Sequence, residues 1–173
     1  MTPVISEERP TRPQSGMRGS SQTGVRLYNE RLVMSLVRTH GSLPKAEIAR
    51  LTGLSPQTVS VIVRQLEKEG LLLKGEAQKG KVGQPLQPFS LAPEGTFAIG
   101  LKVGRRSGDL VLVGLDGVVR KAVHHPYHFP TPEEFMRFAK LGIDELLADL
   151  TPAQRQRISG MGVAAPFDIW KWE

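Results

Sequence analysis

The chain has 173 residues, no cysteine and a net charge of +6, a length that accommodates one or two small domains. Without cysteine there can be no disulfide and no thiolate metal site, and this is typical of proteins in a reducing compartment. No apolar run is long enough to span a membrane and the N-terminus has no signal-peptide core, so we expect a cytoplasmic protein with no membrane partner.

The positive charge is concentrated in one part of the sequence. Residues 26–90 hold ten Lys and Arg against five Glu, whereas residues 91–173 hold ten of each sign. A local basic excess of this kind is typical of proteins that bind a polyanion. A solvated basic surface is the alternative interpretation.

The first 22 residues are rich in Pro, Arg, Ser, Gln and Gly, and we expect a disordered basic arm over 1–22. Helical spacing of apolar residues begins at Val25 and continues to His40. A short second helix is predicted over 45–52, directly after Pro44. Gly53 then marks a turn.

A third helix is predicted from Pro56 to about Glu69, with Ser55 as its N-cap and Gly70 as its stop. Its apolar side holds Val59, Ile62 or Val63, and Leu66. Two short strands, 71–74 and 86–91, enclose the polar, glycine-rich segment "GEAQKGKVGQP", which favours a β-ribbon with a long tip. The order helix, helix, turn, helix, ribbon predicts a winged helix-turn-helix domain over 23–92.

In such a domain the helix after the turn enters the major groove of double-stranded DNA. Gln pairs with adenine, Arg with guanine, and lysines beside glycines at a wing tip neutralise phosphates. The exposed positions of the third helix are Ser55, Gln57, Thr58, Ser60, Val61 and Arg64, whereas its apolar side is structural and is assigned no contact with DNA. The residues expected to bind DNA are Ser55, Pro56, Gln57, Thr58, Ser60, Arg64, Lys79, Lys81 and Gln84. An ordinary three-helix packing unit and a protein-interaction module are the alternatives.

The character of the sequence changes after the hinge "APEG" at 92–95. Three consecutive strands joined by tight turns are predicted between residues 96 and 126. A helix follows from Pro132 to about Asp149, capped by Thr131, and "ISGMGVAAP" is typical of a buried strand that leads into a loop. The inner face expected for the helix is formed by Phe135, Phe138, Leu141, Ile143, Leu146 and Leu147. We therefore expect a partial α/β domain over 96–173.

The order of these parts, with "GQP" in the wing, "AIGLKVG" in the first strand and "GVAAPF" in the last loop, resembles the ROK family of bacterial transcriptional regulators and sugar kinases. The resemblance implies a winged helix-turn-helix joined to the first half of an actin-like (ribonuclease H-like) α/β domain. It also implies a repressor of carbohydrate-related genes that senses a sugar or sugar phosphate and works as a homo-oligomer on palindromic operators.

Two departures from the family affect the alternative reading as a ROK-type sugar kinase. Kinase members carry an Asp that handles the metal ion after the first strand, whereas Lys102 is near that position here. Phosphoryl transfer is therefore not expected. The family's cysteine-containing zinc cluster is also missing. His124, His125 and His128 have no evident carboxylate partner, and we expect a solvated strand end with no metal and no cofactor.

The family's sensing domain continues beyond "APFDIWKWE", which suggests a C-terminally truncated product. By resemblance, Pro166, Phe167 and Asp168 are candidate ligand-binding residues near the sugar. We expect an uncovered sheet edge, and Phe167, Ile169, Trp170 and Trp172 would add to its exposed apolar surface. The second segment should therefore be only marginally stable alone or pair with another chain. A remnant with only non-specific DNA binding is a further alternative.

Overall fold

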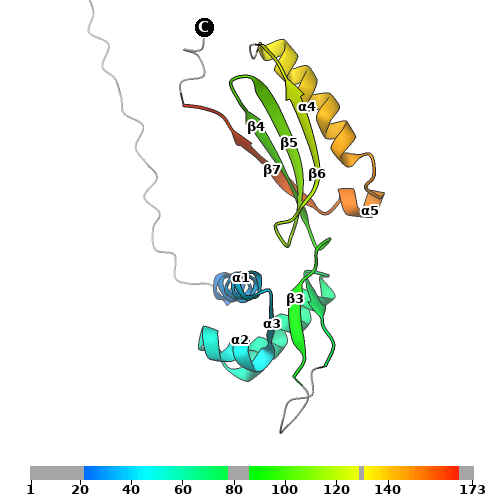
Figure 1. Cartoon of the computed structure of the whole chain (residues 1–173). Coiled ribbons are helices and arrows are strands. Elements are labelled where there is room, and N and C mark those ends of the chain that lie inside the picture. The colour runs from blue at the N-terminus through cyan, green and yellow to red at the C-terminus, as the bar shows by residue number, and fades with distance from the viewer. Residues whose placement is uncertain (1–21, 78–85, 129–130, 168–173) are drawn as a thin grey trace, which may run out of the picture.

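Two units, each with its own hydrophobic core, follow one another along the chain (Figure 1). The computed structural model describes residues 22–77, 86–128 and 131–167. The first unit contains α1 (Gln22–His40), β1 (Ser42–Pro44), α2 (Lys45–Thr52), α3 (Pro56–Lys68), β2 (Leu72–Lys74) and β3 (Pro88–Leu91). The second contains β4 (Phe97–Val103), β5 (Ser107–Gly114), β6 (Val119–Pro126), α4 (Pro132–Leu147), α5 (Pro152–Arg155) and β7 (Ile158–Ala164). None of the helices within the described ranges combines the length and apolar character of a membrane crossing.

Local sequence signals define α2, α3 and the turn between them. Gly53 adopts φ +71° and donates its N–H to the carbonyl of Ala49 across 3.0 Å, which ends α2 in a left-handed conformation that favours glycine. Ser55 then caps α3, because its hydroxyl oxygen accepts the N–H of Thr58 at 3.1 Å, and Pro56 occupies the first turn. The predicted helix-turn-helix is confirmed.

A three-stranded antiparallel sheet with the order β1-β3-β2 closes the first unit. The ribbon of β2 and β3 was expected, whereas β1 was not; it pairs Leu43 with Phe89. All four apolar candidates of α3, including both Ile62 and Val63, are buried. The core of this unit is formed by Val33, Val37, Leu43, Ile48, Ala49, Val59, Ile62, Val63, Leu66, Leu72, Phe89 and Leu91. The sheet and helices thus bury the apolar side of α3 and leave its other side exposed.

The second unit is a four-stranded mixed sheet with the order β6-β5-β4-β7, and α4 packs on one of its faces (Figure 1). Strands β4, β5 and β6 form an antiparallel meander, and β7 pairs with β4 in parallel. Helix α4 lies very close to β5. A Cβ atom added to Gly108 of β5 would be only 2.5 Å from the ring of Phe138 on α4. The predicted fold class, a winged helix-turn-helix followed by an α/β unit, is confirmed.

Two details of the second unit differ from expectation. Strand β7 was expected to be buried, yet every residue after Ile158 in it is exposed. The reason is that β7 is an edge strand of the sheet, and no described element covers it. Leu141 was expected on the inner face of α4 but is 62% exposed, since Gly142 takes the position against β5 and a Cβ there would meet Leu110 at 2.5 Å.

A short connection joins the two units. The N–H of Ala92 donates to Leu71 across 2.9 Å, and the N–H of Leu115 donates to Pro93 across 3.3 Å. Leu115, in the turn after β5, also packs against the core of the first unit. The connection is therefore hydrogen-bonded to both units.

Candidate DNA-binding surface

The surface of interest is the side of α3 that faces away from the first core. Gln57, Val61 and Arg64 are exposed and lie at helical positions i, i+4 and i+7, so they form one stripe along the helix. Lys68 continues the stripe one turn further on. A polar stripe with one basic end, on the helix that follows the turn, can donate hydrogen bonds to base edges and phosphates.

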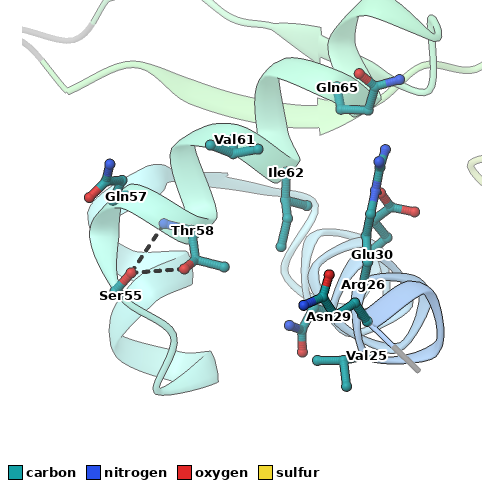
Figure 2. Close-up of a pocket in the computed structure, with 11 residues that line it drawn as sticks. Val25, Arg26, Asn29, Glu30, Ser55, Gln57, Thr58, Val61, Ile62 and Gln65 are labelled. Atoms are coloured by element: carbon teal, nitrogen blue, oxygen red, sulfur yellow. Dashed lines mark hydrogen bonds and ion pairs between the residues drawn. The ribbon is translucent and has the colours of Figure 1, made fainter. Parts of the chain in front are cut away.

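The other predicted residues of α3 lie at its N-terminal end or on its flanks. Ser55 and Pro56 are exposed, while Thr58 and Ser60 are half-buried. The hydroxyls of Ser55 and Thr58 lie 2.8 Å apart and Figure 2 shows both bonds of this cap. Because the Ser55 oxygen already accepts the N–H of Thr58, its first role is to hold the start of the helix.

A groove of about 450 Å³ lies between α3 and the N-terminal half of α1 (Figure 2). Sequence reasoning did not predict it, because it requires the relative placement of two helices. Arg26 and Asn29 line its α1 side, and Gln57, Thr58 and Val61 line its α3 side. The N-terminal end of the exposed stripe on α3 thus borders this groove, which has polar groups on both sides.

The arginines of the first unit differ in whether a carboxylate lies at salt-bridge distance. Arg26 pairs with Glu30 at 2.7 Å, and Arg50 contacts Glu47 at 2.5 Å. The hydrogen bond from Arg50 lowers the pKa of Glu47. Within residues 22–77, 86–128 and 131–167, Arg64 has no carboxylate at salt-bridge distance. Its guanidinium is therefore available to an anion.

The wing is described only at its base. Gly75 donates its N–H to Pro88 at 2.8 Å, and the side chain of Gln87 donates to the carbonyl of Gly75 at 3.0 Å. These bonds fix the point at which the two arms of the wing leave the sheet. The predicted tip residues Lys79, Lys81 and Gln84 lie outside the described residues.

The candidate ligand residues of the second unit follow β7. Pro166 is exposed and Phe167 is 87% exposed, while Asp168 lies outside the described residues. A hollow of about 680 Å³ lies nearby on β4, β5 and β7, but Pro166 and Phe167 do not line it. Lys102 and Asp109 are among its lining residues.

The histidines of β6 have carboxylate neighbours, contrary to expectation. His124 Nδ1 lies 2.6 Å from Asp109 Oδ1, and Lys102 Nζ lies 3.6 Å from Asp109 Oδ2. His125 Nε2 lies 3.8 Å from Glu134. The strand pairing explains the first contact, because Asp109 and His124 are directly opposed in β5 and β6. A hairpin register drawn around the turn at Asp116 and Gly117 could have revealed this pair from the sequence.

Comparison with protein families identifies the class of the first unit. A family model described as winged helix-turn-helix DNA-binding matches residues 26–72, which include α2, α3 and the stripe on α3. This chain therefore contains a winged helix-turn-helix DNA-binding domain.

Individual relatives extend the likeness into the second unit. The chain is 27% identical over 138 residues to the uncharacterised protein y4fQ of Sinorhizobium fredii, with 80% of this chain and 35% of that protein covered. It is 28% identical over 112 residues to the dual regulator NagC of Escherichia coli, covering 62% of this chain and 28% of NagC. The xylose repressor of Bacillus spizizenii is 28% identical over 115 residues, which are 66% of this chain and 30% of that protein.

A solved ROK family transcriptional regulator, a homologue of E. coli Mlc, has a similar fold. Its TM-score is 0.58 at 18% sequence identity, over 82% of this chain and 36% of that one. The resemblance to ROK regulators is therefore confirmed. The chain spans about a third of the length of the relatives it matches.

Proposed function

We propose that this chain is a sequence-specific DNA-binding transcriptional regulator that reads double-stranded operator DNA with α3. The observation that carries the proposal is the exposed stripe from Gln57 to Arg64, held on a helix whose other side is fully buried. Arg64 can pair with guanine and Gln57 with adenine. Arg64 has no described carboxylate to compete with a base.

The relatives support the finer part of the proposal, a repressor of carbohydrate-related genes. Proteins named N-acetylglucosamine repressor and xylose repressor are each 28% identical to this chain over more than a hundred residues. On this proposal the protein acts on bacterial DNA in the cytoplasm. A regulatory role also agrees with Lys102, which lies near the position where sugar kinases are expected to carry a metal-handling carboxylate. The ammonium group of Lys102 pairs with Asp109.

Fluorescence anisotropy of the purified chain tests the DNA-binding proposal. The probe is a duplex from the region upstream of its own gene, compared with a scrambled duplex at two salt concentrations. We expect tighter binding to the upstream duplex and weaker binding at the higher salt, because bound phosphates release counterions. Gln57→Ala and Arg64→Ala should each cost about 1–3 kcal/mol of binding free energy and reduce the preference between duplexes.

Lys68→Ala and Lys140→Ala are the matched controls for charge. Both side chains are exposed, but Lys68 extends the stripe on α3 while Lys140 lies on α4. Lys68→Ala should weaken binding to both duplexes equally and lower the salt slope by about 1, whereas Lys140→Ala should change neither. Equal affinity of the unmodified chain for both duplexes would contradict sequence-specific binding and leave only non-specific binding.

We further propose that the second unit senses a sugar or sugar phosphate and that the chain forms a homo-oligomer. Pro166, Phe167 and Asp168 remain the predicted ligand residues. Isothermal titration with N-acetylglucosamine and with xylose, compared between the chain and its Phe167→Ala variant, tests the first part. Sedimentation equilibrium tests the second, because two half-sites on a palindrome require two winged domains.

A further inference from the structure

Val61 is an exposed apolar side chain in the middle of the polar stripe on α3. Its side chain is 60% exposed, while Gln57 and Arg64 flank it one turn away on each side. Alanine has a higher helix propensity than valine, and Val61 lies outside the core of the first unit. Valine at this position therefore contributes little to the stability of the helix or of the core.

The spacing along α3 places Val61 between the two base-reading side chains. An α-helix rises about 1.5 Å per residue, so Val61 is about 6 Å from Gln57 and about 4.5 Å from Arg64 along the helix axis. Successive base pairs are about 3.4 Å apart. A helix that presents Gln57 and Arg64 to base edges in the major groove therefore presents Val61, which lies between them on the same stripe, to the same stretch of bases.

The chemistry of the major groove identifies what Val61 can contact there. The 5-methyl group of thymine is the apolar group exposed in that groove, and apolar side chains read it by contact. A β-branched side chain in a helix has one strongly preferred rotamer, so little conformational freedom is lost when it packs against a methyl group. Figure 2 shows that Val61 has Gln57 on the preceding turn of α3.

From this geometry we propose that Val61 is a specificity-determining residue that reads the methyl group of a thymine lying between the base pairs contacted by Gln57 and Arg64. The inference rests on the proposed DNA-binding function. It adds a requirement that hydrogen bonding alone does not impose: one position of each half-site must carry thymine, and uracil, which lacks the 5-methyl group, does not replace it.

Replacement of thymine by deoxyuridine tests the proposal, because it removes the methyl group and keeps the base pairing. A duplex is first selected by the full chain from a library of random-sequence duplexes, and each thymine is then replaced in turn. We expect one position per half-site at which the change weakens binding about fourfold, the effect of one buried methyl group. Val61→Ala should lose sensitivity at that position, and Val61→Thr, which keeps one methyl group, should retain most of it.

Val118→Ala is the matched control, because Val118 is also half-exposed, at 50%, but lies in the turn before β6. It should leave the pattern of deoxyuridine sensitivity unchanged. Equal sensitivity of the unmodified chain and Val61→Ala at every thymine would overturn the proposal. So would a changed oligomer mass in Val61→Ala with unaltered DNA binding, which would place Val61 in a protein contact. Failure of the unmodified chain to select any sequence would instead refute the DNA-reading function itself.

Discussion

Arg157 and Glu69 connect the two units of the chain, since Arg157 Nη2 donates a hydrogen bond to the backbone carbonyl of Glu69 across 2.7 Å. Glu69 is the C-cap of α3, where backbone carbonyls lack partners within the helix. Arg157 Nε also donates to the carbonyl of Gly95 at 2.8 Å. Arg157 lies directly before β7, and its guanidinium thus joins the end of α3 to the connection between the units.

The Arg157→Ala variant should uncouple the two units. We expect a loss of about 1 kcal/mol of stability and faster amide hydrogen exchange at residues 69–72, together with weaker operator binding. Arg155→Ala is the matched control, because Arg155 donates instead to the carbonyls of Leu147 and Leu150 at the end of α4. It should destabilise the second unit without changing exchange at the end of α3; an equal effect of both variants there would contradict the coupling.

Substitutions of Ser55 should separate its capping role from DNA contact. Ser55→Ala removes the acceptor of the Thr58 N–H and should cost about 1 kcal/mol of stability. Ser55→Asp keeps a capping oxygen and should restore stability, yet weaken DNA binding through its negative charge. Urea unfolding and anisotropy measure the two effects, and Ser60→Ala should leave the unfolding midpoint unchanged. Unaltered stability of Ser55→Ala would show that the cap is unimportant.

Glycine substitutions should test the close packing of α4 on the sheet. Gly108→Ala places a Cβ atom 2.5 Å from the Phe138 ring and should destabilise the protein by about 1–3 kcal/mol through overpacking. Gly162→Ala is the control, since a Cβ there meets nothing within 4 Å; it should be neutral or slightly stabilising. Thermal unfolding followed by circular dichroism distinguishes the two, and equal melting temperatures would refute the predicted clash.

Asp109 should make stability depend on pH in the acid range. The hydrogen bond with His124 is the main reason that the pKa of Asp109 is lowered in the folded state. A carboxyl with a lowered folded-state pKa stabilises the fold above its unfolded-state pKa of about 3.9, and this contribution disappears as the pH falls through the folded-state value. Asp109→Asn should therefore be less stable than the unmodified chain at pH 7, with the gap closing below about pH 4. A constant gap in urea unfolding across this range would contradict the assignment.

The parts of the fold that sequence predicted well are those with local signals. The pair Ser55 and Pro56, the apolar spacing of α3 and the stop at Gly70 act within a few residues, so they predicted α3 almost to its ends. The meander of β4, β5 and β6 likewise follows from alternating apolar residues and the turn at Gly117, whose φ is +80°.

The features that sequence did not predict depend on distant residues. Strand β1 is three residues long, and it is a strand because β3, which is distant in the sequence, pairs with it. The exposure of β7 depends on which elements cover it rather than on its own apolar composition. The bond from Arg157 to Glu69 joins residues 88 positions apart, and neither residue type carries a signal for it. The exposure of Gln57 and Arg64 could be predicted because both lie on one helix, whereas the groove beside them needed the placement of α1.

The position of β4 connects the second unit to the winged helix-turn-helix unit through a short segment. It has a strand on each side, β5 and β7, and it follows β3 of the wing after only five residues, 92–96. Such a short connection leaves the four-stranded sheet little freedom to move independently of the wing. Because Arg157 also ties the start of β7 to the end of α3, we expect the sheet and α3 to reorient together rather than independently.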